Sequence, residues 1–275
     1  MLDVLYAQWR ALGVPFNASL PAKRLEAIDP EALIWCSLEF LESEPRLAEG
    51  VRAWLAANSG SVIRQRLNTF AKAADARSDI WRSLDAGKGT RASPRQAVGS
   101  RKTTRQIEST KPLGRRAPGT ATIFLRARDI LGNDLRSFLI VYLVGSPRGI
   151  RLRLVQEWTG YSYRSISEAA VSWERAGVVS IQHGHCILAN SAPWRDLLDC
   201  RSGDVIVVDW PAAYGTSIEL LRTLRKAREK GFDESHTLVR SAIAATAASL
   251  VTAAAGADDA TSCCIAHLRM AVSRD

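Results

Sequence analysis

The chain has little cysteine and little histidine for its length. Its 275 residues include five Cys and four His, and an odd, sparse set of thiols excludes the disulfide-dense scaffold of a small secreted domain. Long apolar runs are missing too, because the uncharged stretch 241–257 is mostly Ala, Ser and Thr and falls short of the ~20 strongly apolar residues of a spanning helix. Asp3 and Arg10 interrupt the start of the chain, so no signal peptide is expected. We predict a cytoplasmic protein with no membrane partner.

The short motifs that mark common enzyme families are also missing. No G-x-x-x-x-G-K-[ST], G-x-S-x-G, H-E-x-x-H or G-x-G-x-x-G pattern occurs, and the apolar run 205–208 with Asp209 has the shape of a Walker B element without its phosphate-binding partner.

Metal-ligating side chains gather only loosely, at His183, His185, Cys186 and Cys200. Adjacent residues of a strand point to opposite faces, which argues against a shared ion at 185 and 186. We predict no metal, no cofactor and no enzymatic activity; the alternative is an active site assembled from distant residues.

Positive charge is in excess and is concentrated in one segment. The chain has 37 Lys and Arg against 28 Asp and Glu, a formal net charge of +9 and a pI near 9.7. Residues 88–116 contain nine basic residues and a single acid, Glu108, and so carry +8 of this charge. The segment is rich in Gly, Ser, Thr and Pro without a helical or alternating apolar pattern, which is typical of a solvated linker. We predict a basic flexible linker over 84–120 and a polyanionic partner.

Before the linker, residues 1–83 predict a helical domain. Asp29 and Pro30 suit the cap and first position of one helix. Further helices are expected after Pro45 and from about Ser61, where apolar residues recur at helical spacing. The expected core includes three tryptophans, Trp9, Trp35 and Trp54.

After residue 192 the pattern predicts a helical C-terminal extension over 193–256. It contains Leu197 and Leu198, then a hydrophobic strand over 205–208 and an amphipathic helix with a basic outer face. Asp233 suits the cap of another, Ala-rich helix, which we expect to be soluble. The last segment, 257–275, is expected to be a loose tail.

The pattern between residues 121 and 192 is the most informative. Asp134 suits the cap of an apolar helix, and a short strand over 150–152 then leads into a brief helix that ends at Gly160. Ser162 suits the cap of the next helix. Two strands around the turn His183-Gly184 predict a hairpin. The expected inward stripe of the helix after Ser162 is Ile166, Ala169, Ala170 and Trp173.

The order helix, short strand, short helix, glycine turn, helix and hairpin is that of a winged helix-turn-helix. The stretch GIRLRLVQEWTGYSYRSISEAAVSWERAGVV resembles the winged-helix DNA-binding domains of prokaryotic transcription regulators in its helix spacing and its glycine positions. A weaker likeness, in ARDILGNDLR and PWRDLL, is to regulators found beside toxin or nucleotidyltransferase partners. The resemblance implies a mainly α fold with a small β-hairpin wing over 121–192, between the helical N-terminal domain and the C-terminal extension. It also implies a transcriptional regulator that binds double-stranded DNA as a homodimer.

The helix over 163–176 is then the expected recognition helix, whose N-terminal end meets base edges in the major groove. Arg164 is the best candidate for a bidentate guanine contact. Base contacts are expected from Tyr163, Arg164, Ser165, Ser167 and Glu168. Phosphate contacts are expected from Arg148, Arg151 and Arg153 beside the short helix and from Arg101, Lys102, Arg105, Arg115 and Arg116 in the linker.

These residues also have plainer interpretations. Exposed charges on a helix commonly face only solvent, and the arginines beside the short helix have Glu157 and Glu174 as available ion-pair partners. The turn at His183-Gly184 has no Lys or Arg, which argues against a minor-groove contact by the wing. The alternative function is an antitoxin or other protein-interaction module that uses the same fold to bind a partner protein.

Overall fold

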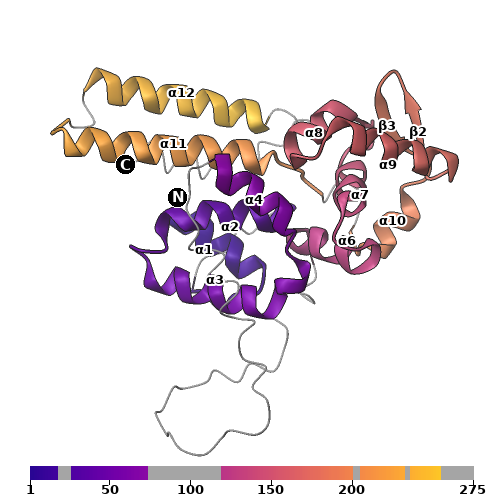
Figure 1. The fold of residues 1–275 in the computed structure, drawn as a ribbon, viewed down its shortest axis with the longest axis horizontal. Coiled ribbons are helices and arrows are strands. Elements are labelled where there is room, and N and C mark those ends of the chain that lie inside the picture. Colours follow the sequence, from indigo (N-terminus) through magenta and orange to yellow (C-terminus); the bar gives the residue numbers. More distant parts are fainter. Residues whose placement is uncertain (18–25, 74–118, 201–204, 233–235, 255–275) are drawn as a thin grey trace, which may run out of the picture.

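The computed structural model describes residues 1–17, 26–73, 119–200, 205–232 and 236–254, and Figure 1 labels its α-helices and two of its strands, β2 and β3. The N-terminal part contains α1 (Leu2–Ala11), α2 (Pro30–Ser37), η1 (Leu38–Phe40), α3 (Pro45–Asn58), η2 (Ser59–Ser61) and α4 (Arg64–Ala73). The central part contains η3 (Thr120–Thr122), α6 (Ile123–Leu131), α7 (Leu135–Gly145), β1 (Ile150–Arg151), α8 (Leu152–Thr159), α9 (Tyr163–Arg175), β2 (Val179–Gln182), β3 (His185–Leu188) and α10 (Ala192–Leu197). The C-terminal part contains α11 (Trp210–Glu229) and α12 (Thr237–Ala254).

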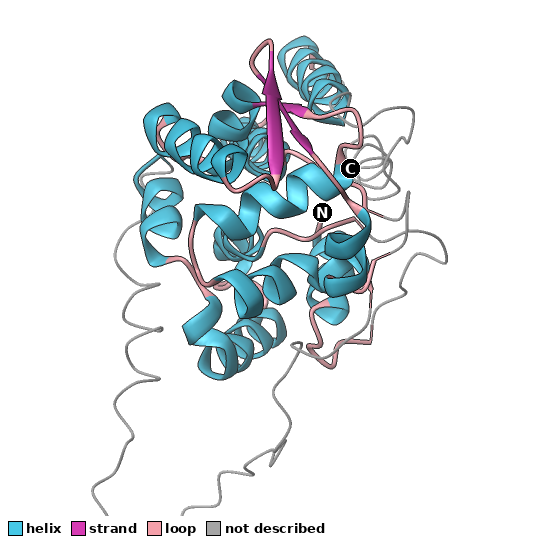
Figure 2. Ribbon diagram, turned by 90° about the vertical axis from the view of Figure 1, so that its right-hand side faces the viewer, coloured by secondary structure: helices cyan, strands magenta, loops and turns pink. Residues whose placement is uncertain are grey.

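The helices form two adjoining bodies and a long pair. Helices α1 to α4 form one body, α6 to α10 and the strands form the other, and α11 and α12 lie side by side along the first (Figure 1). Helix α11 packs against α2 and also contacts α8, so it touches both bodies. The strands lie at one end of an otherwise helical molecule, as Figure 2 shows. The predicted mainly α class with a small β element is confirmed.

The helix starts follow from side chains that the sequence places next to them. Asp29, Asp134 and Ser162 each accept a hydrogen bond from a first-turn backbone N–H, at 2.8–3.2 Å. The first four N–H groups of a helix have no partner within the helix, so each of these caps satisfies a donor that is otherwise unpaired. All three predicted caps are confirmed.

The third N-terminal helix begins later than predicted. Ser61 belongs to η2, Val62 has extended backbone (φ −93°, ψ 128°), and α4 begins at Arg64. Val62 and Ile63 are both buried, but they face different hydrophobic clusters. Consecutive side chains of an extended backbone point to opposite sides, which lets Val62 and Ile63 reach the two clusters before α4 begins.

The core consists of two hydrophobic clusters that share residues from several predicted segments. The first joins side chains of α1 to α4 with others from α11, and it includes the three predicted tryptophans, Trp9, Trp35 and Trp54. The second joins side chains of α6 to α9 with the sheet, and it also contains Ala27 and Ile63 from the N-terminal part. Each cluster therefore depends on chain segments far apart in the sequence.

The predicted strand over 205–208 is wrong, since these residues are buried but belong to no strand. Ile206 and Val208 face the first cluster, whereas Val205 and Val207 face the second. The backbone meets that of Ala27, whose N–H donates to Ile206 O at 3.0 Å. A connecting segment that is buried between two hydrophobic clusters is as apolar in sequence as a buried strand. It differs only in that it forms no regular hydrogen-bonded pairing with a neighbouring strand.

The three strands form one antiparallel sheet in the order β1-β3-β2. Strands β2 and β3 are the predicted hairpin, and both residues of its turn, His183 and Gly184, have positive φ (50° and 77°), as in a type I′ turn. Strand β1 pairs with β3, with Arg151 opposite His185. The short strand before α8 thus becomes an edge of the hairpin sheet.

Several predicted features lie outside the described residues: the linker predicted over 84–120, as far as residue 118, the cap Asp233 and the tail 257–275. The predicted linker ends too late, because Thr120 already belongs to η3. The predicted Ala-rich helix corresponds to α12. Among the described residues, no helix has both the length and the apolar character that a bilayer crossing requires.

Candidate nucleic-acid interface

Helix α9 has one face anchored in the core and its N-terminal end free. Gly160 ends α8 with left-handed backbone (φ 73°), and the Ser162 side chain caps α9 directly after it. The buried residues Ile166, Ala170 and Trp173 recur every three or four positions. The other side of the helix is therefore left toward solvent.

Four of the five predicted base-contact residues are exposed. Tyr163 is 48% exposed, a large value for an aromatic residue. The side chains of Arg164 and Glu168 are 88% and 65% exposed. Ser165 is exposed too, but its Oγ lies 2.8 Å from the Oγ of the cap serine, and Ser167 is half-buried. The free end of α9 thus presents an aromatic ring, a cation and an anion.

The cation and the anion are in contact. Arg164 Nε donates a hydrogen bond to Glu168 Oε1 at 2.8 Å, across one helical turn. This hydrogen bond and the carboxylate charge raise the pKa of Arg164 above its ordinary value. Arg164 is therefore positively charged at neutral pH.

The predicted phosphate-contact arginines fall into two groups. Arg148, Arg151 and Arg153 are exposed and lie around β1 and the start of α8. Arg151 Nε donates to His185 Nε2 of β3 at 3.3 Å, so it lies on the sheet of the hairpin. The turn of the hairpin and the strands β2 and β3 contain no Lys or Arg, and the pairing of β1 with β3 brings Arg151 to this sheet. The other group, Arg101, Lys102, Arg105, Arg115 and Arg116, lies outside the described residues.

A cluster of four buried charges, which the sequence did not reveal, lies between the two bodies. The buried charge cluster consists of Asp29 and Glu31 from the start of α2, Arg66 of α4 and Arg128 of α6. Arg66 contacts both oxygens of Asp29 at 2.5 Å, and Arg128 donates to both oxygens of Glu31 at 2.9 and 2.7 Å. Two negative and two positive groups balance, so the attraction and hydrogen bonds between them offset the cost of removing these charges from water.

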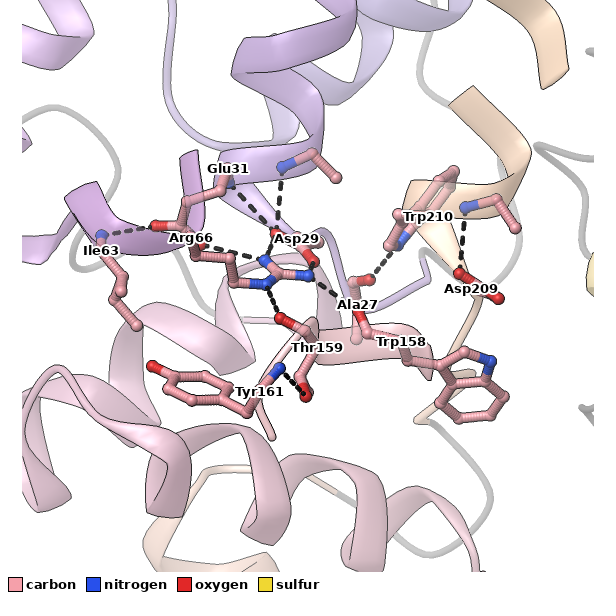
Figure 3. Close-up of polar contacts among 12 residues, drawn as sticks. Ala27, Asp29, Glu31, Ile63, Arg66, Trp158, Thr159, Tyr161, Asp209 and Trp210 are labelled. Atoms are coloured by element: carbon pink, nitrogen blue, oxygen red, sulfur yellow. Dashed lines mark hydrogen bonds and ion pairs between the residues drawn. The ribbon is translucent and has the colours of Figure 1, made fainter. Parts of the chain in front are cut away.

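Arg66 also reaches the turn that leads into α9. Its Nε donates to Thr159 O and its Nη2 to Trp158 O, both at 2.9 Å (Figure 3). These carbonyl groups end α8 and lack partners in the helix, and a cation is favourable at this end of the helix dipole. Burial by itself lowers the pKa of Arg66, but the charge of Asp29 and its hydrogen bond outweigh burial, so the pKa is raised. The N-terminal body thereby fixes the end of α8 and the position of α9.

Asp209 has a structural role that accounts for its place after the apolar run. Its side chain caps α11 by accepting a hydrogen bond from Ala212 N at 3.0 Å, and the next residue, Trp210, donates to Ala27 O at 2.6 Å (Figure 3). Burial raises the pKa of Asp209 to about 6, although the Ala212 hydrogen bond opposes the shift. The resemblance to a Walker B element thus has a simpler origin in helix capping.

The raised pKa of Asp209 predicts a stability change with pH. The folded state binds this proton more tightly than the unfolded state, so ionised Asp209 destabilises the fold above about pH 6 and the penalty disappears toward pH 4. Asp209→Asn keeps a good cap without the charge. We expect it to raise the free energy of unfolding by about 2 kcal/mol at pH 8, with the gain shrinking as the pH falls. Urea unfolding between pH 4 and 8 measures this.

The control for that experiment is Asp134→Asn, which makes the same change at a cap whose side chain is 46% exposed. If Asp209→Asn raises the free energy of unfolding by the same amount at pH 8 and at pH 4, the predicted cost of the buried charge is wrong.

The loose group of metal-ligating residues does not come together. Cys186 is buried, and burial raises the pKa of its thiol to about 11, which disfavours the thiolate that binds metals. Its neighbour His185 faces Arg151 instead. In the part of the chain that the structure describes, no three His, Cys, Asp or Glu side chains are grouped to hold a metal ion.

Comparisons with other proteins return nothing that resembles this chain: no protein-family model, no curated protein and no solved structure matches it.

Proposed function

We propose that this protein is a DNA-binding regulator and that residues 121–192 form a winged helix-turn-helix with α9 as recognition helix. The observation that carries the proposal is the division of α9 into an anchored face and a free end. Ile166 and Trp173 are buried, while the Arg164 side chain is 88% exposed in the first turn. An arginine in that place suits a bidentate contact with guanine O6 and N7 in the major groove.

The order of elements gives a second support. Elements α7, β1, α8, α9, β2 and β3 follow one another as the winged-helix resemblance implies. The short turn between α8 and α9, with Gly160 in left-handed conformation, sets the second helix at an angle to the first. Arg66 of the buried charge cluster donates hydrogen bonds to the carbonyl groups at this turn, which fixes the position of α9. A recognition helix fixed in this way can bind DNA without rearranging.

Electrostatics supports a polyanionic partner. Arg148, Arg151 and Arg153 are exposed near the start of α8, and the chain as a whole carries +9. Contacts of arginine with phosphates add affinity for any DNA sequence and make that affinity fall with salt. Sequence preference must then come from the end of α9.

The proposal is tested with Arg164→Ala. A target is first selected from a library of random duplexes, and Kd is then measured for the target and for a random duplex at one fixed salt concentration. We expect the variant to bind the target roughly 10- to 100-fold more weakly, with little change for random DNA, because a bidentate base contact is lost.

The matched control is Arg52→Ala, which removes an exposed arginine from α3. It should keep both affinities within about two-fold of the original. If Arg164→Ala leaves both affinities unchanged, α9 is not the recognition helix. If the original protein selects no target, the DNA-binding function itself is wrong, and a partner protein that covers residues 163–168 becomes the better explanation.

The expected homodimer, the cytoplasmic location and the lack of enzymatic activity stay predictions from the sequence.

A further inference from the structure

The ion pair at the end of α9 has an unusual arrangement. Arg164 is the second residue of the helix and Glu168 lies one turn later on the same side, with Nε and Oε1 2.8 Å apart. Both side chains are largely exposed, 88% and 65%. Within the described residues, Arg164 makes no other hydrogen bond or ion pair.

Helix stability does not explain this pair. A positive charge in the first turn faces the positive end of the helix dipole, which is unfavourable. The favoured order in such pairs is an acid followed by a base four residues later, and here the order is reversed. Exposed ion pairs also contribute little to stability. The ion pair is therefore better explained by a role in binding than by a contribution to the stability of α9.

The atoms that the pair leaves unoccupied suggest that reason. Glu168 contacts Nε, so the two terminal nitrogens, Nη1 and Nη2, remain as a pair of parallel donors at the end of the side chain. This pair matches the O6 and N7 acceptors of guanine. An arginine that is held before binding also loses less conformational entropy when it binds.

The charge of Glu168 has a separate effect. Its side chain is 65% exposed in the N-terminal half of α9. If α9 enters the major groove as proposed, this negative charge repels the phosphates of any DNA sequence. Binding to random DNA is thereby weakened, whereas a target with guanine in the right place recovers affinity through Arg164. Repulsion of wrong partners together with attraction of the right one is a common basis of specificity.

We propose that Glu168 is a specificity-determining residue that positions Arg164 toward a guanine and disfavours DNA that offers only phosphates. This inference rests on the proposed function, because it assigns roles at the same interface.

The test compares two substitutions with the original protein. Glu168→Gln keeps an acceptor for Arg164 Nε but removes the charge, and Glu168→Ala removes both. We expect Glu168→Ala to bind random DNA about 2- to 5-fold more tightly and the selected target about 5- to 10-fold more weakly. Glu168→Gln should bind random DNA more tightly by a similar factor while it keeps more of the target affinity. Repeating the selection with Glu168→Ala should show a weaker preference for guanine at one position.

Two controls separate positioning from charge. Glu49→Ala removes an exposed acid from α3 and should leave the ratio of target to random affinity unchanged. In a protein that already carries Arg164→Ala, the further change Glu168→Ala should raise random binding without lowering the ratio, because there is no arginine left to position. Circular dichroism confirms that each variant is folded.

The outcomes distinguish this inference from the proposed function. If both Glu168 variants raise target and random affinity by the same factor, Glu168 only repels phosphate and the inference is wrong, while the proposed function stands. If Arg164→Ala weakens target binding but Glu168→Ala does not, the positioning role is likewise wrong. If the original protein selects no DNA target, both ideas fail together.

Discussion

Glu31→Gln should destabilise the protein by about 3–5 kcal/mol, because it leaves two buried guanidinium groups with one carboxylate. Glu31 is fully buried and accepts hydrogen bonds from Arg66 at 3.2 Å, from Arg128 at 2.7 and 2.9 Å, and from Ile63 N at 2.8 Å. The amide of Gln fills the same space, so the loss comes from charge rather than from a cavity. A free positive charge in this place has no access to water that would compensate it.

Urea unfolding at pH 7, followed by tryptophan fluorescence, measures the effect as a lower midpoint with an unchanged slope. The matched control is Glu168→Gln, which makes the same substitution in an exposed pair and should leave the midpoint unchanged. A loss below about 1 kcal/mol in Glu31→Gln contradicts the description of the cluster as a closed, charge-balanced unit.

Gly149→Ala should destabilise the central body by about 3 kcal/mol, the sum of backbone strain and of crowding against β3. Gly149 has φ 89°, in the left-handed region that disfavours a side chain. A Cβ there would lie 2.4 Å from Ile187 Cγ1 and 3.0 Å from the backbone O of Cys186. Because the carbonyl belongs to the sheet, β1 must move away from β3 to make room.

The control is Gly177→Ala, which has a similar backbone (φ 72°) but open space within 4 Å. It should cost about 1 kcal/mol, from backbone strain alone. The difference between the two variants in thermal or urea unfolding therefore measures the crowding at β3. Equal losses would falsify the close packing of this turn against the sheet.

Local chemistry accounts for the parts of the fold that the sequence predicts well. Asp29, Asp134 and Ser162 each cap the helix that follows, and the His183-Gly184 turn closes the hairpin. Each of these features depends on residues only a few positions apart, so its energetics are visible in a short stretch of chain. Apolar patterns likewise identify the buried face of α9.

The run 205–208 marks where local reasoning fails. An uninterrupted apolar run is compatible with a buried strand or with a buried connector, and the difference depends on whether another backbone lies alongside to form a ladder. Here Ala27 supplies one hydrogen bond, to Ile206, and the side chains divide between two cores. Sequence patterns report burial, but they do not report which segment pairs with which.

Some features of the candidate interface can be predicted from the sequence, and others depend on contacts between distant segments. The exposure of Tyr163, Arg164 and Glu168 follows from helical periodicity and is visible in the sequence. Two features are not visible there: Arg151 lies beside His185 on the hairpin sheet, and Arg66 holds the end of α8. Their partners are 34 and 93 residues away along the chain.

The amino-acid sequence alone therefore determined the mainly helical class, the caps, the hairpin turn and the outward face of α9, because neighbouring residues decide all of these. Only the tertiary structure decided that the N-terminal and central helices share two interleaved cores, and that the buried charge cluster of Asp29, Glu31, Arg66 and Arg128 joins them. The physical reason is that a buried charge is stable only beside its opposite charge, and folding alone brings together groups that the chain keeps far apart.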